Sequence, residues 1–247
     1  MADTEGRRVS DAEWELRRKL AILCRILGLQ GSIGVFGHVS IRVPDSDVVL
    51  LTPGAGSRKT RVRADQIFAF NLGGTILHHP GGDKPMQIPI EWRIHTQIHK
   101  DRPEILCVAH LHARASTLMG IAGREIVPVF AQGAVIHDGV PTWDDPRLVL
   151  DDSAASALSR TLAHHVACQM RGHGSVVVGE TPELCLQACT HIEENAQYQI
   201  DAASLGGAKP FSSETLQQLA SQRGRTAGTQ LLWSYWQSIV EEQGLPI

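Results

Sequence analysis

The stretch ILCVAHLH, residues 105–112, is an almost unbroken apolar run that ends in two histidines, His110 and His112. Its length, and Pro103 just before it, predict a buried strand. Alternate residues of a strand point to one face about 6.5 Å apart, so both imidazoles can reach a single metal ion. Two histidines that cap a strand or pack beside a helix would show the same pattern, and other features must decide.

Outward from this strand, the pattern predicts helices and mostly non-parallel strands around one core. No repeat or linker divides the chain, so we expect a single domain over residues 1–247 with a helical C-terminal extension from about residue 204. Helices are expected at residues 11–28, from Pro89 to Pro103, and at 113–121, 151–166, 181–203 and 212–242, the last interrupted around residues 224–228; further strands are expected at 38–43, 48–51, 66–71 and 174–178.

Composition excludes several classes of protein. Of the 247 residues, 43% are hydrophobic and 20% charged, which is enough to bury a sizeable core and excludes disorder. The net charge of -3 and the scattered basic residues argue against nucleic acid and membrane surfaces as partners. The polar N-terminal stretch and the lack of a long apolar run predict a cytoplasmic protein. The five cysteines lie mostly in apolar stretches and are expected to be buried free thiols.

Two further residues are candidates for the same site as the histidine pair. His173 lies between two glycines just before a short apolar strand, where it is a natural third ligand, although a histidine in this setting is also a common turn residue. Glu91 is expected on the first turn of the helix that starts at Pro89, where a carboxylate can bind metal, move a proton or simply favour the helix dipole. Three histidines would leave a divalent metal with an open position, which is typical of catalytic sites.

Six ordered motifs resemble those of the class II aldolase and adducin family, which includes the fuculose-phosphate and ribulose-phosphate aldolases and epimerases. The resemblance covers residues 11 to about 203. It implies an αβα fold with a largely antiparallel central sheet flanked by helices, and a homotetramer with active sites at subunit interfaces. The motifs are Gly37-His38-Val39-Ser40-Ile41-Arg42, Leu51-Thr52-Pro53-Gly54, Pro89 and Glu91 with His95, Arg102-Pro103, Ala109-His110-Leu111-His112 and Gly172-His173-Gly174.

By this resemblance, His110, His112 and His173 match the metal ligands of the family. Glu91 matches a catalytic acid or base that can also ligate the metal. The nitrogen-rich set is typical of zinc and is compatible with manganese, iron or cobalt, and no organic cofactor is expected. Adducin-like members keep the fold without the ligands, so the complete set here disfavours a purely structural role.

Departures from the sugar-phosphate enzymes point to another substrate. Gly37-His38 replaces a Gly-Asn pair, and Pro89-Ile90 replaces two serines that hold a substrate phosphate. The stretch from residue 129 to 132, where the aldolases carry a catalytic tyrosine, contains none. The Gly-His-Val-Ser start is most similar to the family's decarboxylases of hydroxylated aromatic and pyridine dicarboxylates. We therefore expect a metal-dependent lyase that removes carbon dioxide from a small hydroxylated aromatic or heteroaromatic carboxylate.

Roles within such a site follow from residue chemistry. Glu91, or else His38, would deliver a proton to the ring carbon, with Glu91 preferred and a backbone-bonded loop histidine as the alternative for His38. His95, four residues after Glu91, is expected to support it. Thr52, Arg58 and Arg171 are the expected substrate-binding residues, although the basic loop that contains Arg58 is equally compatible with simple solvation. Lys59 and Arg61 are further cationic candidates, and Ile90 and Phe130 are expected to supply apolar surface.

Two alternatives remain open at this stage. The same metal site supports retro-aldol cleavage, epimerisation or dehydration of an unphosphorylated hydroxy-carbonyl compound, since each reaction passes through a stabilised enolate. The chain would otherwise be a metal-bearing, inactive assembly module related to adducin.

Overall fold

A single eight-stranded sheet organises the part of the chain that this computed structural model describes, residues 9–80, 86–222 and 225–247. The strands lie in the order β4-β3-β2-β1-β5-β8-β7-β6, and every neighbouring pair is antiparallel except β6 with β7. The expected largely antiparallel sheet flanked by helices is thereby confirmed. The strands are β1 His38–Arg42, β2 Val48–Leu51, β3 Phe68–Asn71, β4 Ile76–His78, β5 Cys107–Leu111, β6 Thr142–Trp143, β7 Ala167–Met170 and β8 Gly174–Gly179.

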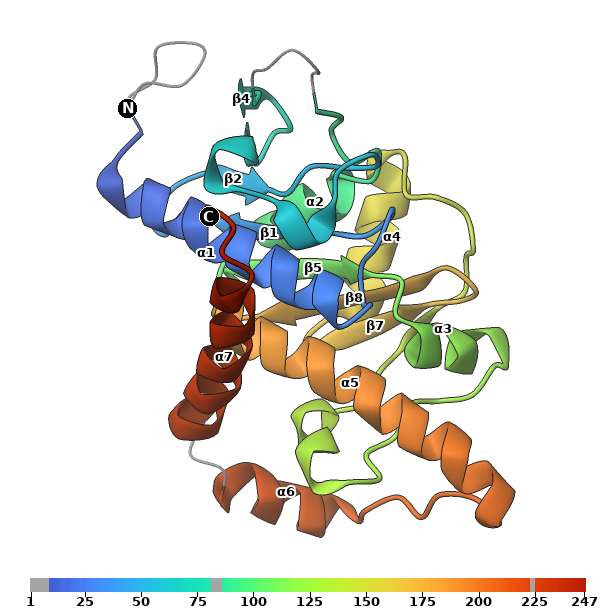
Figure 1. Cartoon of the computed structure of the whole chain (residues 1–247). Helices are drawn as coiled ribbons and strands as arrows, with labels where there is room; N and C mark the ends of the chain where they lie inside the picture. The colour runs from blue at the N-terminus through green and yellow to red at the C-terminus, as the bar shows by residue number, and fades with distance from the viewer. Residues whose placement is uncertain (1–8, 81–85, 223–224) are drawn as a thin grey trace.

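Helices cover both faces of the sheet. α1, α5 and α7 lie on one face, and α2 and α4 lie on the other (Figure 1). α3 follows β5 directly and packs against α5, while α6 packs on a short 3-10 helix. The helices are α1 Asp11–Leu29, α2 Arg93–Asp101, α3 Arg114–Ile121, α4 Asp152–Leu162, α5 Pro182–Ala202, α6 Ser213–Gln222 and α7 Arg225–Glu242; the 3-10 helices are η1 Lys59–Arg61, η2 Ala64–Gln66, η3 Ala131–Ile136 and η4 Ala203–Leu205.

The ends of the main helices follow from local sequence. The Ser10 hydroxyl accepts a hydrogen bond from the Glu13 N–H at 3.1 Å and so caps the first turn of α1. At the start of α5, the Thr181 hydroxyl accepts from the Leu184 N–H at 3.2 Å, and Pro182 occupies a position where no N–H is needed. These caps satisfy backbone donors that a helix leaves unpaired at its N-terminus.

Strand β5 is buried on both faces. Its residues Cys107, Ala109 and Leu111 belong to the core under α1 and α5, while Val108 belongs to the core under α2 and α4. Because side chains alternate along a strand, His110 lies on the α2 side with Val108. The continuous apolar run in the sequence reflects this double burial.

Two helix boundaries and three strands differ from those expected. α2 begins at Arg93, because tight turns occupy the preceding residues and the Trp92 N–H bonds to the Pro89 carbonyl; Glu91 therefore precedes the helix rather than lying on its first turn. α4 ends at Leu162, where Ala163 takes a positive φ of 47°, so that residues 167–170 form the strand β7, which was not expected. Strands β4 and β6 were missed as well. They have three and two residues, too short for a periodic pattern.

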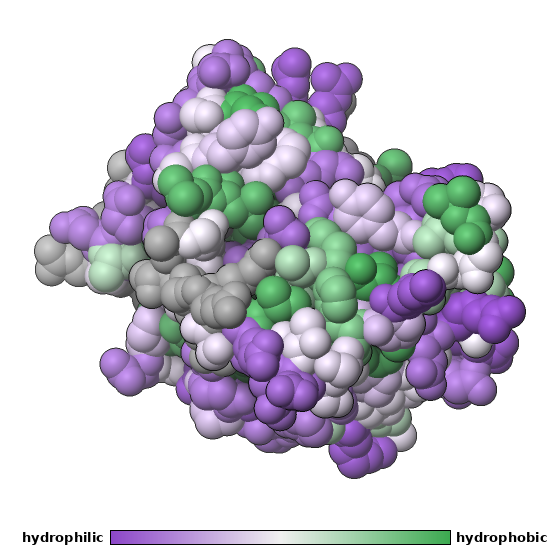
Figure 2. All heavy atoms as spheres, turned by 90° about the horizontal axis from the view of Figure 1, so that it is seen from below, coloured by the Kyte–Doolittle hydropathy of each residue, from purple (hydrophilic) through white to green (hydrophobic). Residues whose placement is uncertain are grey.

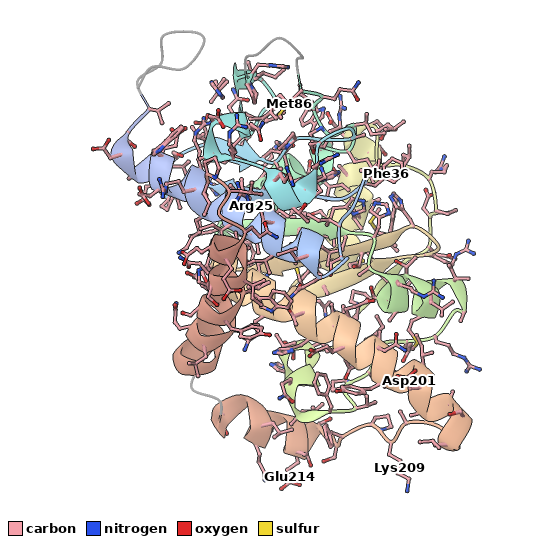
Figure 3. All side chains as sticks on the ribbon, viewed as in Figure 1. Arg25, Phe36, Met86, Asp201, Lys209 and Glu214 are labelled. Carbon is pink, nitrogen blue, oxygen red and sulfur yellow. The ribbon has the colours of Figure 1, made fainter. Side chains whose placement is uncertain are left out.

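The C-terminal region belongs to the same core as α1. Trp233 on α7 is only 5% exposed and packs in the cluster under α1 and α5. The fully buried guanidinium of Arg25 donates to the carbonyls of Val62, Leu245 and Pro246, which holds the C-terminal segment against α1 (Figure 3). The interruption expected around residues 224–228 is wrong for 225–228, which form the first turn of α7, and residue 224 lies outside the described residues.

The five cysteines are free and buried, as expected. Burial raises the pKa of the Cys24 thiol to about 11 and that of Cys168 to about 12, so both remain protonated. Among the described helices, none has the length and apolar character that crossing a bilayer requires.

Candidate metal centre

Strand register brings His38 and His110 side by side. The two residues are direct partners in the antiparallel pairing of β1 with β5, and their ring centroids lie 5.0 Å apart. Both side chains face α2, and their residues are 5% and 0% exposed. A histidine at the start of one strand and another near the end of the next thus meet, although 72 positions separate them in the sequence.

His112 and His173 complete a cluster at the same end of the sheet. His112 follows the last residue of β5, and His173 lies in the turn between β7 and β8. One ring nitrogen from each of His110, His112 and His173 lies within 4.8 Å of the others. The Nε2 atoms of His110 and His112 are 3.1 Å apart. The three histidines predicted as ligands therefore converge.

Glu91 reaches this cluster from the turn before α2. Its Oε2 lies 3.6 Å from His110 Nε2 and 3.5 Å from His173 Nε2, while its Oε1 accepts a hydrogen bond from the Val149 N–H at 2.9 Å. Burial raises the pKa of this carboxyl, but the adjacent His110 and His173 rings and the hydrogen bond from the Val149 N–H outweigh burial and leave the pKa below its ordinary value. Glu91 is therefore a fixed, ionised carboxylate.

The hydrogen bonds around the cluster leave unprotonated or unpartnered ring nitrogens close to one another. His110 Nδ1 donates to the Ser175 carbonyl at 3.3 Å, so its Nε2 carries no proton in the neutral ring. Within the described residues, neither of the two buried ring nitrogens of His173 has a hydrogen-bond partner. Burial, together with the nearby His110 and His173, lowers the pKa of His112 to about 4, so the His112 ring is neutral near pH 7.

The converging imidazoles, of which His173 has two unpartnered nitrogens, lie beside an ionised carboxylate. This arrangement fits a divalent metal. His110, His112, His173 and Glu91 are the residues able to hold it, and His38 lies against Glu91 and His110 within 4.8 Å. This donor set, three nitrogens and one carboxylate, matches the ligand types of zinc, manganese, iron and cobalt.

His95 has different partners from those expected. Because Glu91 lies before α2, the two residues do not share a helical face. His95 Nε2 instead lies 2.6 Å from His38 Nδ1, and His95 Nδ1 lies 2.7 Å from the Ser40 hydroxyl. His99, one turn further along α2, bonds to the other side of the same hydroxyl at 2.9 Å. Sequence reasoning missed Ser40 and His99, although residues 38 and 40 share a strand face and residues 95 and 99 share a helix face.

The residues expected to bind substrate differ in their exposure and in their hydrogen-bond partners. Thr52 is fully buried, and its hydroxyl accepts the Val39 N–H at 3.0 Å, which supports β1 rather than a substrate contact. Arg58 and Arg61 are exposed, whereas Lys59 is buried and donates to the Pro53 and Gly54 carbonyls. Lys59 therefore has a structural setting in the loop.

Arg171, the remaining substrate-binding candidate, adjoins the turn that carries His173. It pairs with Asp144, and its side chain is 51% exposed. This position leaves the guanidinium accessible to a ligand at the site.

Exposed apolar side chains border the cluster. The ring of Phe36, on the loop before β1, lies 5.9 Å from the His112 ring and is 64% exposed (Figure 3). Ile90 is 62% exposed beside Glu91, and Leu148 and Leu150 flank the backbone group that binds Glu91. Phe130, in contrast, packs against His191 and Tyr198 of α5, so it does not supply the apolar surface expected of it within this chain.

Solved structures with the same architecture define the class. An aldolase II superfamily protein from Pseudomonas syringae superimposes with a TM-score of 0.83 at 25% identity, covering 96% of each chain. L-fuculose 1-phosphate aldolase from Glaciozyma antarctica superimposes with a TM-score of 0.80 at 20% identity, covering 96% of this chain and 94% of its own. The fold with a histidine cluster at one end of its sheet is thus that of a class II aldolase.

The family model described as "Class II Aldolase and Adducin N-terminal domain" matches residues 18–200, and the chain belongs to this family. Among curated relatives, a 3,4-dihydroxyphthalate decarboxylase from Rhodococcus jostii is 26% identical over 212 residues, covering 83% of this chain and 84% of its own. A protein of the same name from Terrabacter is 28% identical over 200 residues, covering 78% of this chain and 83% of its own.

Proposed function

We propose that the protein is a metal-dependent lyase that decarboxylates a hydroxylated aromatic or heteroaromatic mono- or dicarboxylate. The observation that carries the proposal is the ionised Glu91, held between His110 and His173 with His38 at its side and an exposed apolar border. A flat ring fits the apolar border, and its oxygen substituents fit the cluster. The relatives named 3,4-dihydroxyphthalate decarboxylase support this class of substrate.

The metal would be held by His110, His112 and His173, with Glu91 as an additional ligand. When bound, it would supply positive charge that stabilises the negative charge left on the ring as carbon dioxide departs. The Ser175 carbonyl and the Val149 N–H hold His110 and Glu91 in place for this purpose.

The net reaction consumes one proton from solvent. The bond between the ring carbon and the carboxylate breaks, carbon dioxide leaves, and the electron pair left on the ring carbon accepts the proton. Glu91 is ionised in the free protein, so it takes up this proton before it passes it to carbon. Arg171, half-exposed beside the turn of His173, is the candidate for holding a second carboxylate.

One alternative has an observation in its favour. The likeness of the fold to L-fuculose 1-phosphate aldolase favours retro-aldol cleavage, epimerisation or dehydration of a hydroxy-carbonyl compound at the same cluster. Tyr198 on α5 packs on Phe130 and Tyr235 on α7 packs on Trp236, so within the described residues no tyrosine lies at the cluster to protonate a leaving oxygen. A non-catalytic assembly role, as in adducin, would leave the ionised Glu91 and its positioning unused.

A homotetramer is the assembly that we propose. Figure 2 shows hydrophobic side chains gathered on one face, bordered by hydrophilic ones. Large apolar side chains that remain exposed include Leu205, Leu231 and Tyr235, at 88%, 72% and 62%. Burial of such groups at subunit contacts would be favourable, and sedimentation equilibrium would show a single species of four chains; a monomer would contradict the proposal.

The decisive experiment measures carbon dioxide release from hydroxylated benzoates, phthalates and pyridine dicarboxylates. The protein is stripped of metal with a chelator and reloaded with zinc, manganese, iron or cobalt. Release that depends on metal and is lost in His173→Ala would support the decarboxylase. Inert acids together with cleavage or isomerisation of hydroxy-carbonyl compounds would replace it with aldolase-type chemistry, and inactivity towards both groups would favour the assembly role.

A further inference from the structure

A chain of hydrogen bonds runs from the candidate metal centre into the core between the sheet and α2. His38 Nδ1 lies 2.6 Å from His95 Nε2, and His95 Nδ1 lies 2.7 Å from the Ser40 Oγ. Ser40 Oγ lies 2.9 Å from His99 Nε2, and His99 Nδ1 lies 3.1 Å from the Ile105 carbonyl oxygen. Three imidazoles and one hydroxyl thus connect the cluster to a backbone group.

The Ile105 carbonyl determines which group donates in every hydrogen bond of this chain. A carbonyl oxygen only accepts, so His99 carries its proton on Nδ1 and presents a lone pair at Nε2. The Ser40 hydroxyl must then donate to His99, which leaves its oxygen to accept from His95 Nδ1–H. His95 Nε2 consequently accepts, and His38 donates to it from Nδ1.

Burial fixes this order of donors and acceptors. Ser40, His95 and His99 are each 0% exposed, so water cannot replace a missing donor or acceptor. Burial lowers the pKa of His99 to about 4 and that of His95 well below its ordinary value, so both rings are neutral near pH 7. With neutral rings, reversing the chain would place two donors or two acceptors against each other at Ile105 or Ser40.

We propose that the Ile105 carbonyl, acting through His99, Ser40 and His95, fixes His38 in the tautomer that carries its proton on Nδ1. The remaining nitrogen, Nε2, then presents an unprotonated lone pair on the side of Glu91 and His110, which His38 approaches within 4.8 Å. Ser40, His95 and His99 are positioning residues for His38.

The tautomer assigns different roles to His38 and Glu91, the two candidates for proton transfer, and this consequence rests on the proposed function. The Nδ1 proton of His38 is committed to His95 and its Nε2 presents a lone pair, so His38 accepts a hydrogen bond from a substrate hydroxyl rather than delivering a proton to carbon. Delivery then falls to Glu91. The tautomer itself does not depend on which reaction the site catalyses.

The direct test is solid-state NMR of protein labelled with ¹⁵N at its histidines and loaded with zinc, at neutral pH. Protonated and unprotonated ring nitrogens resonate in well-separated regions, and the signals of His38 are identified by their loss in His38→Gln. We expect His38 Nδ1 in the protonated region and Nε2 in the unprotonated one. A protonated Nε2 would overturn the proposal.

Ser40→Ala provides the variant arm, because it removes the hydroxyl that joins His95 to His99. His95 Nδ1–H then loses the Ser40 hydroxyl as its acceptor, so the proton is expected to move to Nε2 and to be donated to His38, which shifts His38 towards Nε2–H. Ser116→Ala is the matched control. Ser116 is also 0% exposed, and its hydroxyl donates to the Ala113 carbonyl, which is not part of the hydrogen-bond chain from Ile105 to His38. Ser116→Ala should therefore leave the His38 signals unchanged.

His99→Phe covers the case in which Ser40→Ala does not fold. It frees the Ser40 hydroxyl to donate to His95 Nδ1 and predicts the same shift of His38 towards Nε2–H. Unchanged His38 signals in the variant that folds would refute the proposal. Because the readout is the position of a proton, the inference can hold when no carboxylate is decarboxylated, and it can fail when decarboxylation is observed.

Discussion

Replacing Glu91 by glutamine separates the charge of this side chain from its position. In the wild-type protein the Val149 N–H lies 2.9 Å from Glu91 Oε1, and glutamine retains an oxygen that can accept this hydrogen bond. Glutamine removes the negative charge that lies 3.5 Å from His173 and 3.6 Å from His110. A hydrogen bond to a charged group contributes about 1.5–3 kcal/mol. At about 1.4 kcal/mol for each factor of ten, metal affinity should fall by about 10- to 150-fold.

Turnover should fall further than affinity, because the variant also lacks a group able to carry the proton. General acid catalysis by a positioned carboxyl contributes about 10²- to 10⁴-fold, and we expect a loss of that order under saturating metal. Zinc binding by competition with a chelator, carbon dioxide release and calorimetric unfolding would be measured on the same preparations.

The matched variant is Glu91→Ala, which removes both the charge and the acceptor. An unpaired, buried Val149 N–H costs about 1–3 kcal/mol, and for a chain of this length each kcal/mol lowers Tm by about 2–4 °C. Only the alanine variant should therefore unfold earlier. The reasoning is refuted if the glutamine variant keeps wild-type affinity and turnover, or if it loses as much stability as the alanine variant.

Three further predictions concern linkage, pH and packing. Zinc at about 1,000 times its Kd should stabilise the fold by about 4 kcal/mol, a rise in Tm of about 8–16 °C in a thermal scan; an equal rise in His173→Ala would place the metal elsewhere. Folding lowers the pKa of His99 from 6.5 to about 4, so the unfolded chain binds more protons between these pH values, and stability should fall as the pH falls through this window. In urea titrations, His99→Phe should reduce the slope of the unfolding free energy against pH by about 1.4 kcal/mol per pH unit. An unchanged slope would show that the His99 ring does not contribute to this pH dependence. Gly174→Ala would place a Cβ 2.1 Å from the Leu111 carbonyl oxygen, where β5 and β8 meet beside His112. We therefore expect about 1–3 kcal/mol of destabilisation and weaker metal binding. In the control Gly172→Ala, nothing lies within 4 Å of the new Cβ, so the variant should affect stability only through the strain of its own backbone at a positive φ of 68°.

Much of the fold was predictable because the relevant signals are local. The capping serine of α1, Pro182 at the start of α5 and the apolar run of β5 each act within a few residues, and each element lies where expected. Where a boundary was wrong, a non-local or unusual backbone state was responsible. The positive φ of Ala163 ends α4 early, and it is uncommon for a residue with a side chain.

For the site, the sequence identified residue types and their spacing but could not determine partners. His95 was expected to support Glu91 through helical spacing. The turns before α2 remove that relation, and His95 instead bonds to His38 across the gap between helix and sheet. His99 and Ser40 had no assigned role because their relation exists only when α2 packs on β1.

The sequence by itself determined which side chains are available: three histidines at the ends of apolar strands, one carboxylate near a helix start, and a set of motifs that specifies the family. These are consequences of strand periodicity and of turn chemistry, which operate over short distances. Only the tertiary structure decided the register of β1 against β5, the ionisation of Glu91 between two imidazoles and the order of donors from Ile105 to His38. Such properties depend on atoms brought within a few ångströms by packing and on the exclusion of water around them, and neither is encoded in the spacing of residues along the chain.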